Sequence, residues 1–158
     1  MFSQTVEYAL RALIALAFRY DNPMTVQQIS EVAHIPRPYL SKMMQNLARA
    51  DMVRSRRGLG GGFALAHPPD ETTIWDIINA VDPIRRIRTC PREEDQDTAC
   101  PLQRRFDRSL TLLEELFHDT TLGNVVNEIG DRSHHCGWTA DEEPGRTPTR
   151  QRRALNGE

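Results

Sequence analysis

A cluster of basic side chains is the part of this sequence with the clearest chemical potential. Residues 37–57 hold six basic residues and one acidic residue, whereas the whole chain has a formal net charge of −2. The six are Arg37, Lys42, Arg49, Arg54, Arg56 and Arg57. Guanidinium and ammonium groups bind phosphate oxygens, and a local excess of them is typical of a surface that contacts a nucleic-acid backbone. The cluster therefore predicts a DNA-binding surface.

Four glycines follow the last arginines of this cluster. The stretch Arg56–Gly62 separates two short β-like runs, which we place at 52–55 and 63–66. This pattern predicts a β-hairpin whose tip turns sharply, because glycine tolerates positive φ and lets a phosphate approach the backbone closely. The DNA contacts expected at the tip are Arg56, Arg57, Gly60 and Gly61.

Cysteines are the second group of residues that could do chemistry. Cys90 and Cys100 are separated by nine residues in a stretch without apolar periodicity, and Cys136 follows two histidines, His134 and His135. For Cys90 and Cys100 three interpretations remain open: two thiols without a metal, a disulfide switch, or an iron–sulfur cluster. Two thiolates do not supply the four ligands that a cluster usually takes, so the last interpretation needs further donors. The His-His-Cys run lacks a paired motif, and chance explains it better than a metal site does.

The residues before the hairpin read as an amphipathic helix. Leu40, Met43 (or Met44) and Leu47 recur at three- and four-residue steps and so share one apolar face. In a helix-turn-helix the first residues of the second helix lie near base edges in the major groove. Arg37, Tyr39 and Lys42 are therefore expected to contact bases or phosphates.

Further helices are expected on both sides of this unit. An apolar helix at 3–19 precedes a second helix that Thr25 and Gln28 cap, and a short turn joins this second helix to the amphipathic one. After the hairpin, Thr72 or Thr73 caps a short helix ending at Val81. A long helix at 102–118 follows, and then one that Thr120 or Thr121 caps. The apolar side of the long helix is too large for so small a domain to cover, which indicates a dimer interface; it comprises Leu102, Phe106, Leu110, Leu113, Leu116 and Phe117.

These elements predict a mainly α fold with a small β-hairpin: a winged helix-turn-helix with a long C-terminal dimerisation helix. The expected organisation is 1–81 for the DNA-binding domain, 82–101 for a cysteine-bearing sensor loop, 102–130 for the dimerisation helices and 131–158 for a disordered tail. No apolar run reaches the ~18–20 residues of a membrane span, and no secretory signal is present, so we expect a cytoplasmic protein. There is no nucleophile–base arrangement, P-loop or paired carboxylate set, so we expect no enzyme.

Several sequence motifs resemble those of the bacterial winged-helix regulators of the Rrf-two family, typified by the iron–sulfur sensor IscR and the nitric-oxide sensor NsrR. The resemblance covers roughly residues 1–130. The matching motifs are Glu7-Tyr8-Ala9-Leu10-Arg11-Ala12-Leu13, Gln28-Ile29-Ser30, Tyr39-Leu40-Ser41-Lys42, Arg57-Gly58-Leu59-Gly60-Gly61-Gly62-Phe63-Ala64-Leu65-Ala66, Asp76-Ile77-Ile78, Cys100-Pro101-Leu102 and Thr121-Leu122.

The resemblance implies a homodimer that binds double-stranded DNA at a near-palindromic operator, with Ser41 among the recognition-helix contacts. It also implies a cysteine loop that in some members holds a 2Fe-2S cluster. Such members carry three loop cysteines, and in the nitric-oxide sensors an acidic residue of the partner's first helix completes the set. Here the middle cysteine is absent, so Cys90, Cys100 and Glu7 form the candidate metal-binding set, with no cofactor as the alternative.

The sequence thus predicts a DNA-binding transcription regulator of the IscR/NsrR type, a repressor that responds to iron–sulfur, nitric-oxide or redox state. The alternative is a winged helix that binds another protein and carries no sensor cofactor.

Overall fold

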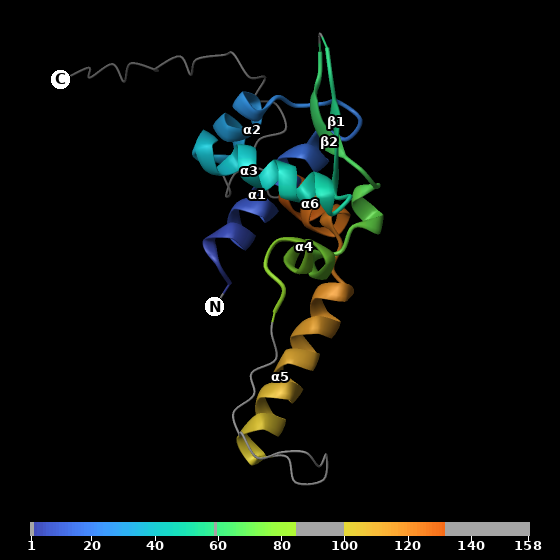
Figure 1. Cartoon of the computed structure of the whole chain (residues 1–158). Coiled ribbons are helices and arrows are strands. Elements are labelled where there is room, and N and C mark those ends of the chain that lie inside the picture. Colours follow the sequence, from blue (N-terminus) through green and yellow to red (C-terminus); the bar gives the residue numbers. More distant parts are fainter. Residues whose placement is uncertain (1, 59, 85–99, 132–158) are drawn as a thin grey trace, which may run out of the picture.

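The structure is a computed structural model, and it describes residues 2–58, 60–84 and 100–131 (Figure 1). The elements in these ranges are α1 (Gln4–Phe18), α2 (Val26–Ala33), α3 (Arg37–Arg49), β1 (Val53–Arg56), β2 (Gly62–Leu65), the 3-10 turn η1 (Pro69–Glu71), α4 (Ile74–Val81), α5 (Pro101–His118) and α6 (Leu122–Asp131). The predicted fold class, mainly helical with one hairpin, is confirmed. Cys90, the His134–Cys136 run and the tail lie outside the described residues.

Helix α1 forms the centre of the hydrophobic core. It is apolar on most of its circumference, and Ala9, Ala12 and Leu13 are completely buried. Helices α2, α3, α4 and α6 and strand β2 all pack against it. A helix that is apolar nearly all round must be enclosed by other elements, which explains this central position.

Local capping explains the helix-turn-helix. The Thr25 hydroxyl accepts a hydrogen bond from the Gln28 backbone N–H, and the Gln28 side chain accepts one from the Thr25 backbone N–H, which confirms the predicted capping box. Helix α2 ends at His34 in the left-handed conformation, with φ 53°. The next N–H, of Ile35, donates to the carbonyl of Ser30, and the Ile35 side chain is buried. The connection from α2 to α3 is therefore short and rigid.

Helix α3 buries the face that its periodicity predicts. Leu40, Met44 and Leu47 are completely buried and Met43 nearly so, so both methionines belong to the core. The opposite face is open to solvent.

Strands β1 and β2 form the antiparallel wing, shifted by one residue from the predicted 52–55 and 63–66. Val53 pairs with Leu65, and Arg56 pairs with Gly62. Val53 and Leu65 are buried against the helices, which makes the base of the hairpin part of the core. Because side chains alternate along a strand, Arg54 and Arg56 then lie together on the other face.

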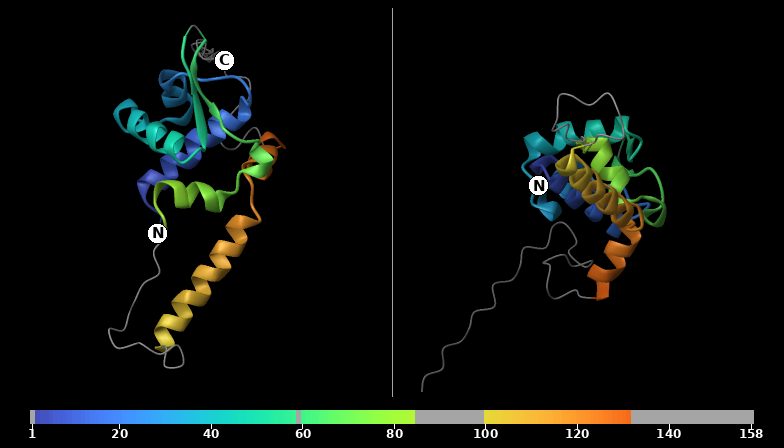
Figure 2. Two further views of the ribbon diagram at one scale, coloured as in Figure 1. Left: turned by 45° about the vertical axis from the view of Figure 1, so that its right-hand side comes forward. Right: turned by 90° about the horizontal axis from the view of Figure 1, so that it is seen from below.

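The C-terminal helices behave differently from each other. Leu122, at the start of α6, is completely buried, and backbone hydrogen bonds join Leu122 to Thr72 and Ile74 to Thr120. Helix α6 therefore returns to the core beside α1. Helix α5, in contrast, has no buried residue and extends away from the other helices (Figure 2). In the described part of the chain, no helix is both long enough and apolar enough to cross a membrane.

Candidate nucleic-acid interface

The outer face of α3 and the wing form the candidate interface. Arg37, Tyr39, Ser41 and Lys42 are all exposed on α3. On the wing, Arg54, Arg56 and Arg57 are exposed, as is Gly60, whereas Gly61 is half-buried. The hairpin tip is closed by a hydrogen bond of 2.9 Å from the Gly61 N–H to the Gly58 carbonyl. All the predicted DNA contacts except Gly61 are therefore exposed to solvent. They lie on two elements that are neighbours in sequence and in space.

The wing is held at a defined angle by a backbone contact that the sequence did not predict. Met24, between α1 and α2, exchanges two hydrogen bonds of 2.8 Å with Phe63 of β2. A Cβ atom on the neighbouring Gly62 would collide with the Met24 carbonyl, and Gly62 has φ 156°. Gly62 thus permits the close approach of two backbones, whereas Gly58 and Gly60 serve the turn at the tip.

A hydrogen bond between an acidic side chain and a histidine closes the base of the wing. Asp51 precedes β1 in the left-handed conformation, with φ 55°, and its carboxylate lies 3.2 Å from Nε2 of His67, which follows β2. Both side chains are exposed, so the pair orients the two strand ends and contributes little to stability.

Tyr39 is positioned by α1. The residue is 65% exposed, and its ring packs edge-on against Tyr8, with 6.4 Å between the ring centroids. The Gln4 side chain donates a hydrogen bond of 3.1 Å to the Tyr8 hydroxyl. The Tyr39 ring therefore projects toward solvent from a supported base.

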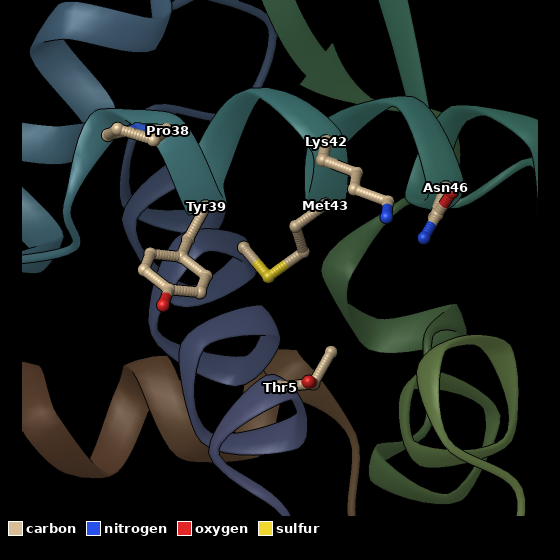
Figure 3. A pocket seen from close by; sticks show the side chains of 6 residues that line it. All are labelled: Thr5, Pro38, Tyr39, Lys42, Met43 and Asn46. Atoms are coloured by element: carbon tan, nitrogen blue, oxygen red, sulfur yellow. The ribbon is translucent and has the colours of Figure 1, made fainter.

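A hollow of about 500 Å³ lies between α3 and the N-terminal turns of α1 (Figure 3). It is lined by Thr5, Pro38, Tyr39, Lys42, Met43 and Asn46. Figure 3 shows Tyr39 and Met43 leaving α3 on the side where α1 and Thr5 lie. Sequence reasoning missed Thr5 and Asn46, because no sequence spacing indicates that these two helices meet here.

Arg37 is tied to the preceding helix. Its guanidinium lies 3.6 Å from the carboxylate of Glu31 on α2, which also accepts a hydrogen bond of 3.0 Å from Gln27. Glu31 therefore offsets part of the positive charge at the start of α3.

Of the candidate metal ligands, the structure describes Cys100 and Glu7, and these two lie on different elements. Cys100 is half-buried just before α5, and the exposed Glu7 carboxylate pairs with Arg11 one turn along α1. The ring of Phe2, near Glu7, packs 5.7 Å from that of Phe117. Phe117 is 17 residues beyond Cys100 on a continuous helix, a separation of about 25 Å at 1.5 Å per residue. Among the described residues no three metal-binding side chains form a group, and Cys90 lies outside them.

Comparison with known proteins adds independent information. The profile of the Rrf2 family, described as "Iron-dependent Transcriptional regulator", matches residues 2–128. A protein of Aquifex aeolicus named "Putative HTH-type transcriptional regulator" is 36% identical over 132 residues, which cover 80% of this chain and 92% of that protein. A second protein of that description, slr0846 of Synechocystis, is 40% identical over 76 residues, covering 48% of this chain and 52% of its own length.

Solved structures share the fold. CymR, the global cysteine regulator of B. subtilis, aligns with a TM-score of 0.67 at 25% identity, covering 81% of this chain and 97% of its own. IscR of T. potens aligns with a TM-score of 0.71 at 22% identity, covering 84% and 90%.

The Arg37–Glu31 pair generates a testable expectation. Glu31→Gln removes a negative charge beside the interface and releases Arg37, so we expect operator affinity at low salt to rise about two- to fivefold. Fluorescence anisotropy with labelled duplex measures this. Glu128→Gln on α6 makes the same charge change away from α3 and should leave affinity unchanged; an equal gain in both variants would show that net charge alone is responsible.

Proposed function

Because the chain belongs to the Rrf2 family of DNA-binding transcription regulators, which are not enzymes, we propose that it acts as a repressor of the IscR/NsrR type. In this proposal it is a cytoplasmic homodimer that binds a near-palindromic operator. The observation that carries the proposal is the shared exposure of basic residues on α3 and on the wing. These residues stand out in a chain whose net charge is negative.

The dimensions of α3 suit the major groove. A helix with its side chains is about 10–12 Å across, and the major groove of B-DNA is about 12 Å wide. Lys42, Ser41 and Tyr39 lie in the first turns of α3, where recognition helices contact base edges. The wing arginines then contact the backbone or the adjacent minor groove.

The uncovered face of α5 supports a dimer. Leu102, Phe106, Leu112 and Leu116 are between 40% and 60% exposed on a helix that extends from the core. Four exposed large apolar side chains on one helix are unusual on a monomer and typical of an interface. Pairing through α5 would join two recognition helices, and a palindromic operator requires them about one DNA turn apart.

The wing arginines provide the first test of DNA binding. Arg56→Ala with Arg57→Ala should weaken binding about equally on operator and on unrelated DNA and lower the salt slope by about 2, because phosphate contacts carry no sequence information. Gel-shift titrations at several salt concentrations measure both effects. Arg104→Ala with Arg108→Ala removes the same charge from α5 and is the control. Unchanged affinity in the wing variant would favour a winged helix that binds another protein.

The dimer has its own test. Leu112→Glu with Leu116→Glu places two charges on the apolar face of α5, so we expect a monomer in sedimentation equilibrium and at least about a tenfold loss of operator affinity, since a monomer engages one half-site. Thr111→Glu, on the polar side of the same helix, should remain dimeric. A double variant that stays dimeric would exclude α5 as the interface.

For the signal we propose a change in the chemical state of Cys90 and Cys100, through iron–sulfur ligation, nitric oxide or oxidation. One protomer does not fit a cluster, because two thiols fall short of four ligands. The Phe2–Phe117 contact also places the residues just before α1 beside the end of α5 that lies farthest from Cys100. A 2Fe-2S cluster would therefore need Glu7 of the partner subunit and at least one further donor. The segment that holds Cys90 joins α4 to α5, and α4 packs against both α5 and α3. A displacement of α4 can thus change the spacing of the recognition helices.

The sensor proposal predicts that the chemical state of the thiols changes operator affinity and that Cys100→Ser abolishes this change. Protein purified without oxygen is assayed for visible absorbance, iron and sulfide, and its operator affinity is compared with that of oxidised and reduced samples. Colour with iron and sulfide identifies a cluster, whereas colourless protein with titratable thiols identifies a thiol switch. Equal affinities in all states would contradict the proposal.

A further inference from the structure

Different elements lie on the two sides of α3, the proposed recognition helix. Figures 1 and 2 show the wing rising on one side of α3 and the N-terminal turns of α1 lying on the other. The hollow between α3 and α1 opens on this second side. A helix in the major groove has a phosphate backbone along each flank, because two backbones border the groove. The wing accounts for one flank only.

The chemistry of the hollow suits an anion. Its lining includes the Lys42 ammonium, the Asn46 amide and the Thr5 hydroxyl, and no acidic residue. In the described part of the chain, none of these three side chains has a hydrogen-bond or ion-pair partner. Lys42 and Asn46 are one helical turn apart on α3, and Thr5 faces them from α1 (Figure 3). Met43, which is nearly buried, adds an apolar side chain to the lining.

We propose that this hollow receives a backbone phosphate of the DNA, on the side of the major groove away from the wing. Lys42 supplies the charge, and the Thr5 hydroxyl and the Asn46 amide nitrogen donate hydrogen bonds to the phosphate oxygens. The volume of about 500 Å³ accommodates the phosphodiester with its attached sugar. The inference rests on the proposed DNA-binding function and adds α1 to the interface, so that α3 is clamped between two backbone contacts.

Thr5→Val is the primary test, because it removes the hydroxyl and preserves the shape of the side chain. Loss of one hydrogen bond to a charged group should weaken binding about three- to tenfold, equally on operator and on unrelated DNA. The melting temperature should not change, since Thr5 is exposed. Thr111→Val on α5 is the matched control. If Thr5→Val binds the operator as tightly as the wild-type protein does, this inference alone is overturned. If the wild-type protein itself does not bind DNA, the proposed function is overturned instead.

Charge and backbone substitutions locate the contact. Asn46→Asp should weaken binding by at least about tenfold by repelling the phosphate, whereas Asn127→Asp on α6 adds the same charge elsewhere and should have little effect. Duplexes with a neutral methylphosphonate at each successive position of one half-site then scan the backbone. At one or two positions, the methylphosphonate should lower the affinity of the wild-type protein more than it lowers the affinity of Thr5→Val. Strict additivity of Thr5→Val with every methylphosphonate would overturn the inference.

Discussion

The burial of α1 is the interaction on which the rest of the structure depends. Ala9, Ala12 and Leu13 have no exposed surface, and four helices and one strand pack against α1. The small alanine side chains let these neighbours approach closely. As a result α3 presents its outer face on one side of the core, while α1 still reaches the edge of that face through Tyr8 and Thr5. The central packing element is thus also a border of the candidate interface.

The wing shows how a local backbone requirement sets a functional geometry. A two-stranded hairpin alone is marginally stable and free to pivot. Here Val53 and Leu65 bury its base, and the paired hydrogen bonds between Met24 and Phe63 join it to the turn before α2. Gly62 makes that junction possible, because any side chain would collide with the Met24 carbonyl. The direction of the wing arginines relative to α3 therefore follows from core packing and one backbone bridge.

The same packing connects the cysteine segment to the DNA-facing helix. Helix α4 contacts α1, α3 and α5, and the segment with Cys90 leaves from its end. Leu122, at the start of α6, is completely buried in the core. Its burial holds the C-terminal end of α5 in place. The opposite end of α5, which carries Cys100, extends away from the core, whereas the C-terminal end of the helix stays beside the core elements.

The sequence by itself determined the elements, the core faces and most of the basic surface. Periodicity identified the buried face of α3, the Thr25–Gln28 box marked the start of α2, and the glycine run placed the wing to within one residue. These features depend on local interactions, between residues a few positions apart. Tertiary structure alone decided that Met24 bridges to Phe63, that Glu31 holds Arg37 and that Thr5 and Asn46 share a hollow. Each of these contacts depends on the angle and distance at which separate elements pack, which no spacing within one element can specify.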